Sequence, residues 1–236
     1  MECAAVVAAA SEHILLARSM IPIPGVALMR WGSDEKARLS ERRAGRKSGG
    51  VGSGSRRRAL ATSDALARLR VQIGHLWCIT TPLEIVLVLG SSISAPRECY
   101  RFVVDGNPTR GDPSVESSLP VPRSCPASQK LCMHVAKRWS DDGYPKLPTT
   151  RMSVLVKVPN QGELSQRFPQ GFRALPTGFS LDGLLSRRRV VQQTVIKIAL
   201  GPHKTPNQET CTSDHECWLV AETRVEGIRG LGPFSL

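Results

Sequence analysis

The stretch Leu83-Glu84-Ile85-Val86-Leu87-Val88-Leu89 is the densest apolar run of the chain, and Pro82 and Gly90 lie directly on either side of it. A short apolar run rich in branched side chains, bounded by proline and glycine, is typical of a buried β-strand. We therefore expect this strand to form the centre of the fold. Upstream, apolar residues recur at three- and four-residue spacing between residues 63 and 75. This spacing predicts a helix that packs against the strand.

The same two kinds of pattern predict the other elements. Residues 151–158 alternate between apolar and polar side chains and form the clearest half-buried strand of the sequence. Residues 4–18 are rich in strong helix formers and end before Pro22. We expect helices near 4–18, 63–75 and 129–139, and strands near 83–89, 99–104, 151–158, 190–199 and 217–221. The predicted fold class is α+β, with a loosely organised small sheet, antiparallel or mixed, a few short helices, and much irregular or disordered chain.

Shifts in composition divide the chain into five segments. A basic, glycine-rich stretch and a later Ser/Pro-rich stretch separate the regions that carry helix and strand patterns. The segments are an N-terminal helix and loop (1–35), a disordered basic Gly/Ser/Arg linker (36–60), a helix-strand-strand segment (61–107), a Ser/Pro-rich connector (108–127) and a C-terminal α+β segment (128–236).

Positive charge is the strongest bulk property of the sequence. The chain has 32 Lys and Arg residues against 20 Asp and Glu, a formal net charge of +12, which favours polyanionic partners such as nucleic acid. Within 36–58 nine residues are basic and one is acidic, and the glycines at 45 and 49–54 oppose a stable helix. The candidate nucleic-acid-binding residues are Arg42, Arg43, Arg46, Lys47, Arg56, Arg57, Arg58, Arg187, Arg188 and Arg189.

The spacing of two of these clusters also bears on localisation. Arg42-Arg43 and Arg56-Arg57-Arg58 are separated by twelve residues, a spacing typical of a bipartite nuclear localisation signal that a nuclear import carrier would bind. We therefore expect a nuclear or cytoplasmic protein, with organellar targeting by the Arg-bearing N-terminal region as an alternative. Secretion is not expected, because the seven cysteines are odd in number and irregularly spaced.

A membrane-attached protein is a second alternative. Residues 71–93 carry only Glu84 as a formal charge and are just long enough to cross a bilayer as a helix. His75, Pro82 and Glu84 lie near the middle of this segment, where a carboxylate is costly. We therefore expect a soluble helix followed by a strand here rather than a membrane span.

No motif of the sequence has the spacing that a known kind of catalysis requires. A nucleophile elbow, a Walker loop and a dinucleotide-binding fingerprint are all missing. The Cys and His residues that could hold zinc have gaps too wide for tight zinc knuckles; they are Cys125, Cys132, His134, Cys211, His215 and Cys217. We therefore predict no enzyme, no cofactor, no metal site and no small-molecule substrate.

The bulk composition leaves two readings of function open. The first is a basic, non-enzymatic protein that binds nucleic acid or other polyanions through its arginine clusters. The second is a poorly folded product of a GC-rich reading frame with no evolved activity. Richness in Arg, Ala, Gly, Pro and Ser, with only 5% aromatic residues, fits a GC-rich frame. Natural folded sequences normally show local and global signals that agree, and such agreement is sparse here.

Overall fold

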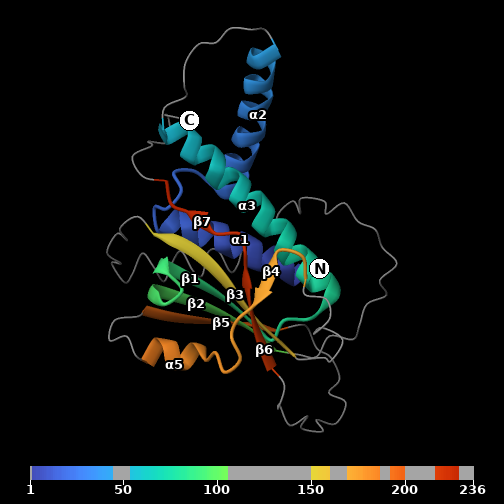
Figure 1. Cartoon of the computed structure of the whole chain (residues 1–236), viewed down its shortest axis with the longest axis vertical. Coiled ribbons are helices and arrows are strands. Elements are labelled where there is room, and N and C mark those ends of the chain that lie inside the picture. The colour runs from blue at the N-terminus through green and yellow to red at the C-terminus, as the bar shows by residue number, and fades with distance from the viewer. Residues whose placement is uncertain are drawn as a thin grey trace.

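The protein forms one mixed β-sheet with helices on both of its faces (Figure 1). The computed structural model describes residues 2–44, 54–105, 150–159, 169–186, 192–199 and 216–228. Its helices are α1 (Glu2–Ala17), α2 (Gly25–Ala44), α3 (Gly54–Ile79) and α5 (Leu181–Ser186). Its strands are β1 (Glu84–Ser92), β2 (Ala95–Asp105), β3 (Arg151–Pro159), β4 (Phe172–Ala174), β5 (Gln192–Ala199), β6 (Glu216–Ala221) and β7 (Val225–Glu226).

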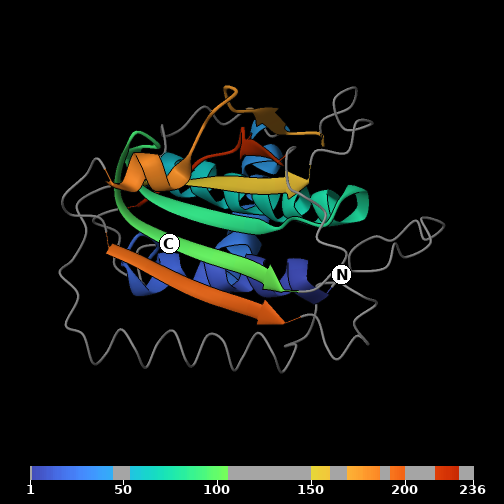
Figure 2. The same ribbon diagram turned by 90° about the horizontal axis from the view of Figure 1, so that it is seen from below.

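The seven strands follow the order β4-β6-β3-β1-β2-β5, and β7 pairs with β3 beside β6. All pairs are antiparallel except β2 with β5, which run parallel. Figure 2 shows the sheet as a layer with α5 in front of it and the three long helices behind it. The predicted α+β class is therefore confirmed, and the sheet is of the mixed kind.

Strand β1 lies in the middle of the sheet, between β2 and β3. Residues 85–89 are each at most 1% exposed, so both faces of this strand are covered. Successive side chains of a strand point to opposite faces, and Ile85, Leu87 and Leu89 accordingly pack in the core beneath the helices, whereas Val86 and Val88 pack on the other side. The prediction of a central buried strand is confirmed.

Two hydrophobic cores hold the layers together. The larger core lies between the sheet and the long helices and unites side chains from distant parts of the chain, such as Leu15, Leu76, Phe102, Val154 and Leu219. The smaller core lies under α5, where Leu181 packs with strand residues and the Phe179 and Trp218 rings meet edge to face, with centroids 5.8 Å apart. Burial on both faces is the main source of stability of such a sheet.

Most of the predicted elements lie where the patterns placed them. The helix at 4–18 corresponds to α1, and the helix at 63–75 is the middle part of α3. The strands at 99–104, 151–158, 190–199 and 217–221 correspond to β2, β3, β5 and β6. The predicted helix at 129–139 lies outside the described residues.

The prediction of a disordered linker over 36–60 is wrong for 36–44 and for 54–60, which belong to α2 and α3. Helix α2 begins after Pro24, whose carbonyl accepts a hydrogen bond from the Leu28 N–H at 2.9 Å. From residue 33 to 44 it contains no glycine and many strong helix formers. The glycines behind the linker prediction stand only at 45 and 49–54, and residues 45–53 lie outside the described residues.

The alternative of one membrane-spanning helix over 71–93 is also wrong. The first part of this segment is the end of α3, and the second part is strand β1, which pairs on both of its edges. Residues 80–83, which include Pro82, separate the end of α3 from the start of β1. Within the described part of the chain, no helix is both long and apolar enough to cross a membrane.

Two cysteines give a direct test of this packing. Cys99 is 1% exposed in the smaller core, and burial raises the pKa of its thiol to about 12 from 9.0, whereas Cys78 is exposed on the last turn of α3. A rise of about three pKa units lowers the thiolate population near neutral pH about a thousandfold, and the thiolate is the reactive form. We expect a thiol reagent to modify Cys78 rapidly and Cys99 only after denaturation, as measured by peptide mass spectrometry. Equal modification of both thiols in native buffer would contradict the packing of β2.

Candidate nucleic-acid interface

The structure places half of the predicted nucleic-acid-binding residues at the two helix ends that flank residues 45–53. Arg42 and Arg43 lie in the last turn of α2, and Arg56, Arg57 and Arg58 lie among the first five residues of α3. The remaining candidates lie outside the described residues; they are Arg46, Lys47, Arg187, Arg188 and Arg189. The two described clusters therefore belong to two ordered helices.

Positive charge in the described chain is concentrated on these two helices. Together α2 and α3 contain ten basic and four acidic residues, whereas the other described residues contain eight basic and nine acidic ones. The sheet and its remaining helices are thus almost neutral. Clustered charge of one sign raises the local concentration of counter-ions of the other sign.

Helices α2 and α3 approach each other closely through small side chains. A Cβ atom added at Gly32 would lie only 2.1 Å from the Ser63 Oγ and 2.8 Å from the Ser63 Cβ. One turn further along α2, Lys36 forms an ion pair with Asp64 of α3. The absence of a side chain at Gly32 therefore lets the backbones of the two helices pack, and the crossing fixes how the basic residues are presented.

A buried carboxylate lies beside this crossing. Glu35 of α2 is only 3% exposed, and its Oε2 accepts a hydrogen bond from the Arg56 Nη2 of α3 at 3.1 Å. Its Oε1 lies 3.0 Å from the Arg56 Nε, within ion-pair distance. Both carboxylate oxygens therefore contact the planar fork of the guanidinium. Arg56 is therefore held against α2, although it lies in the first turn of its own helix.

The neighbouring arginines have no such partner. Arg57 and Arg58 are exposed, and neither forms an ion pair with any carboxylate among the described residues. Within the described part of the chain, the two arginines make one side-chain hydrogen bond, a weak one from the Arg58 Nε to the Gly54 carbonyl at 3.3 Å. Three more exposed arginines on these helices also form no ion pair with a described carboxylate; they are Arg30, Arg38 and Arg68.

The position of Arg56, Arg57 and Arg58 is unfavourable for the helix itself. A helix N-terminus carries partial positive charge, so cations in the first turn destabilise it and anions stabilise it. The first turn of α3 contains no acidic residue, and among the described residues only Glu35 of the neighbouring helix forms an ion pair with one of the three cations there, Arg56. Folding therefore accounts for Arg56 but gives no reason for Arg57 and Arg58.

The C-terminal end of α2 projects past the other labelled helices and the sheet (Figure 1). Residues 36–41 are all exposed, including Leu39. Their side chains, among them Lys36 and Arg38, are accessible to a large partner without any rearrangement of the sheet. The basic surface defined by α2 and the N-terminal half of α3 is thus open to solvent.

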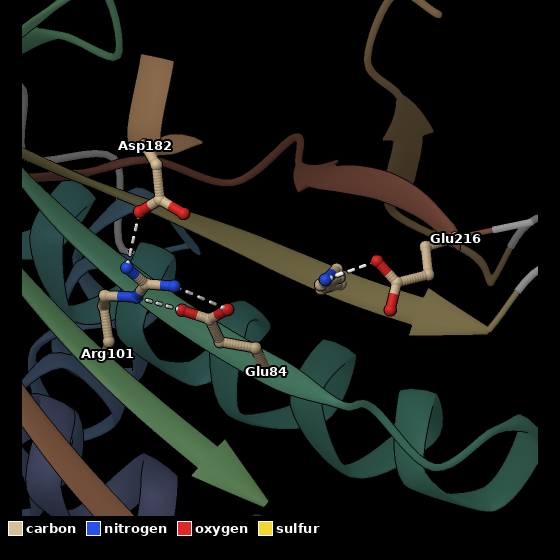
Figure 3. Close-up of polar contacts among 5 residues, drawn as sticks. Glu84, Arg101, Asp182 and Glu216 are labelled. Atoms are coloured by element: carbon tan, nitrogen blue, oxygen red, sulfur yellow. Dashed lines mark hydrogen bonds and ion pairs between the residues drawn. The ribbon is translucent and has the colours of Figure 1, made fainter. Parts of the chain in front are cut away.

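A second group of charges lies on the face of the sheet that α5 covers (Figure 3). Arg101 of β2 bonds to both oxygens of Glu84 on β1, with 3.1 Å from Nη2 to Oε2, and its Nη1 lies 2.7 Å from Asp182 of α5. The pKa of Arg101 is raised. The largest cause is the hydrogen bonding to Glu84, and the nearby Asp182 contributes in the same direction. On the next two strands, Lys157 pairs with Glu216. Opposite charges alternate across four strands, and with Asp182 the group contains three acidic and two basic side chains. It therefore stabilises the sheet through cross-strand pairs and has no excess positive charge for a polyanion.

Metal chemistry finds no support in the described residues. Within the ranges that the structure describes, no group of three or more His, Cys, Asp or Glu side chains could hold a metal ion. Of the zinc candidates of the sequence, only Cys217 lies in this part of the chain, on β6. The other candidates, Cys125, Cys132, His134, Cys211 and His215, lie outside it.

Glu12 holds the three long helices together at the other end of α2. Its carboxylate accepts a hydrogen bond from the Val26 N–H, at the N-terminus of α2, and its Oε1 lies 3.8 Å from the Arg70 Nε of α3. A Cβ at Gly25 would lie 2.6 Å from this side chain. Burial raises the pKa of Glu12, against the opposing effects of Arg70 and the Val26 bond.

A pH-dependent stability follows from this burial. Because the folded pKa of Glu12 lies above the unfolded one, its protonated form stabilises the fold at low pH, and that stability is lost as pH rises through the folded pKa. Glu12→Gln keeps the acceptor for Val26 but cannot ionise. We expect urea titrations to show that the free energy of unfolding of this variant, measured relative to that of the unmodified chain, increases as the pH is raised from 4.5 to 7. Glu222→Gln, at an exposed position, is the control, and equal behaviour of the two variants would contradict the prediction.

Comparison of the chain with models of known protein families gave no match, and comparison with curated proteins gave none either.

Reasoning from the sequence missed the residue that organises this surface. Leu28, Gly32 and Glu35 recur at spacings of four and three residues and share the buried face of α2. A helix prediction over 25–44 would have placed Glu35 on that face, as a carboxylate that needs a cationic partner. The partner itself could be found only once the crossing with α3 was known.

Proposed function

We propose that this protein binds nucleic acid through phosphate contacts made by the exposed arginines of α2 and α3. The observation that carries the proposal is the charge distribution: the two helices hold ten basic and four acidic residues, while the rest of the described chain is almost neutral. A protein that only needed positive charge for solubility would have no reason to collect it on one pair of helices.

The chemistry of the exposed side chains supports the same proposal. Arginine presents a planar fork of donors that fits phosphate oxygens, and it stays charged at all relevant pH values. Arg57 and Arg58 are exposed and lack an ion-pair partner among the described residues, and the N-terminus of α3 beside them favours anions. These contacts read the backbone and not the bases, so we propose a binding protein with little sequence preference and no catalytic step.

Salt dependence of binding tests this proposal. Phosphate contacts release counter-ions, so the logarithm of affinity falls linearly with the logarithm of salt concentration, by about 0.9 for each contact on duplex DNA. With two to five arginines engaged, fluorescence anisotropy with a labelled duplex between roughly 50 and 200 mM salt should give a slope of about −2 to −4.5. Binding that does not change with salt, or no binding at low salt, would contradict it. Weaker binding to the duplex than to heparin would indicate a different polyanion as the partner.

A nuclear location is part of the proposal and depends on the same residues. In the structure, Arg56 is engaged by the buried Glu35, so an import carrier would have to compete with this ion pair for one of the five arginines of the bipartite pattern. A reporter fused to residues 36–60 should enter the nucleus, and it should stay cytoplasmic when Arg57 and Arg58 are replaced by alanine.

A further inference from the structure

The buried position of Glu35 is not explained by the packing around it. Glu35 is 3% exposed, and transfer of a carboxylate from water to a protein interior is costly unless it is fully paired. An apolar residue at this place would pack between the helices without that cost. The carboxylate is also the acidic side chain that faces the most basic turn of the described chain, where Arg56, Arg57 and Arg58 follow one another.

The bond to Arg56 sets the rotation of the first turn of α3. Successive residues of an α-helix are separated by about 100° around its axis. Once the hydrogen bond and the ion pair with Glu35 hold Arg56 against α2, the directions of Arg57 and Arg58 follow from this spacing. Without this bond, nothing but Gly54 and Ser55 precedes the arginines in the helix, and terminal turns fray readily.

We propose that Glu35 is a positioning residue of the basic surface: it holds Arg56 and thereby directs Arg57 and Arg58 toward the phosphates of a bound nucleic acid. This inference rests on the proposed function, since it concerns how that surface is arranged. Glu35 does not touch the nucleic acid. Glu35 offsets one positive charge of the surface and yet increases affinity for a polyanion, because it preorganises Arg57 and Arg58, which have no ion-pair partner among the described residues.

The variant Glu35→Gln separates this role from simple electrostatics. The amide retains the shape of the side chain but has one oxygen and no charge, so it cannot keep both the hydrogen bond to the Arg56 Nη2 and the ion pair with its Nε. It also raises the net charge by one. Electrostatics alone predicts tighter binding to DNA and a steeper salt slope, since Arg56 would become available for phosphate. Positioning predicts weaker binding and a shallower slope, so the two explanations differ in sign.

We expect Glu35→Gln to bind a labelled duplex about eightfold more weakly at about 0.1 M salt, with a slope shallower by about 1, equivalent to one lost phosphate contact. Asp34→Asn is the matched control, because Asp34 is the adjacent residue on α2, is exposed, and undergoes the same change of charge. The control should bind as tightly as the unmodified chain or more tightly. A Glu35→Gln variant that behaves like Asp34→Asn would overturn the inference.

Two further measurements make each outcome decisive. Protection of the Cys99 thiol shows whether Glu35→Gln is folded. If it is not folded, Glu35→Asp takes its place, because it keeps the charge but is too short to reach Arg56 with both carboxylate oxygens. Unchanged affinity and slope in that variant overturn the inference. Failure of the unmodified chain to bind DNA contradicts the proposed function itself and removes the basis of the inference. Binding by the unmodified chain, with unchanged slope in the Glu35 variant, contradicts the inference alone.

Discussion

The double variant Arg57→Gln/Arg58→Gln is expected to bind duplex DNA about 60-fold more weakly than the unmodified chain at about 0.1 M salt, with a salt slope shallower by about 2. Each lost phosphate contact removes about 0.9 from the slope, which corresponds to about eightfold in affinity at this salt concentration. Both side chains are exposed on α3, so the fold should remain intact. Removal of cations from the first turn should even stabilise the helix slightly.

A second double variant makes the comparison independent of net charge. Arg97 on β2 and Arg173 on β4 are exposed, lie outside α2 and α3, and form no ion pair among the described residues. Arg97→Gln/Arg173→Gln therefore removes the same charge from a different part of the surface. Anisotropy titrations of the two variants side by side should show the large loss only for the α3 pair. Equal losses would mean that bulk charge, and not the α2–α3 surface, attracts the DNA.

The centre of the sheet could be predicted because its signals are local. The run 83–89 is apolar on both faces, and Pro82 and Gly90 bound it in the sequence. Strand β3 is recognisable because Met152, Val154 and Val156 alternate with other residues on one face. The prediction that it is only half-buried is wrong, because Ser153 and Leu155 on the opposite face are buried as well. In these segments the residues themselves determine the type of element, whatever the rest of the chain does.

Other features depend on parts of the chain that meet only in the folded state. The parallel pairing of β2 with β5, which brings Phe102 opposite Ile196, cannot be read from either strand alone. The ion pair of Arg18 with Glu98 joins residues 80 positions apart, and the Tyr100 hydroxyl donates to the same carboxylate at 2.8 Å. Both charged side chains are buried, whereas an isolated Arg or Glu in a sequence is expected at the surface.

The sequence identified the arginines of the basic surface but not the helices that present them. The arginine clusters at 42–43 and 56–58 are visible in the sequence, yet their density and the nearby glycines favoured a disordered linker. What the linker prediction lacked was the close packing of Gly32 against Ser63 and the burial of apolar α3 residues such as Leu66 in the core, which join these strongly charged helices to the fold. Tertiary contacts of this kind override local composition.

Replacement of Leu87 by alanine is expected to lower the free energy of unfolding by about 2 to 5 kcal/mol, the usual range for a leucine in a packed core. Leu87 is fully buried in β1, opposite Tyr100 and Val154 on the neighbouring strands, in the core beneath the helices. Because domains have a total stability of about 5 to 15 kcal/mol, this is a large share. Urea titrations followed by tryptophan fluorescence should show an earlier midpoint with an unchanged slope.

The control for this variant is Val195→Ala on β5, a branched apolar residue that is 49% exposed at the edge of the sheet. It removes apolar atoms that water already reaches, so we expect a change within about 0.5 kcal/mol. The contrast between the two positions also tests the alternative of a poorly folded chain without evolved activity. A chain that lacks a specified core has no reason to distinguish Leu87 from Val195. The absence of any cooperative transition, or equal effects of the two variants, would favour that alternative. A large effect at Leu87 alone would show that the chain has a specified core with a buried central strand.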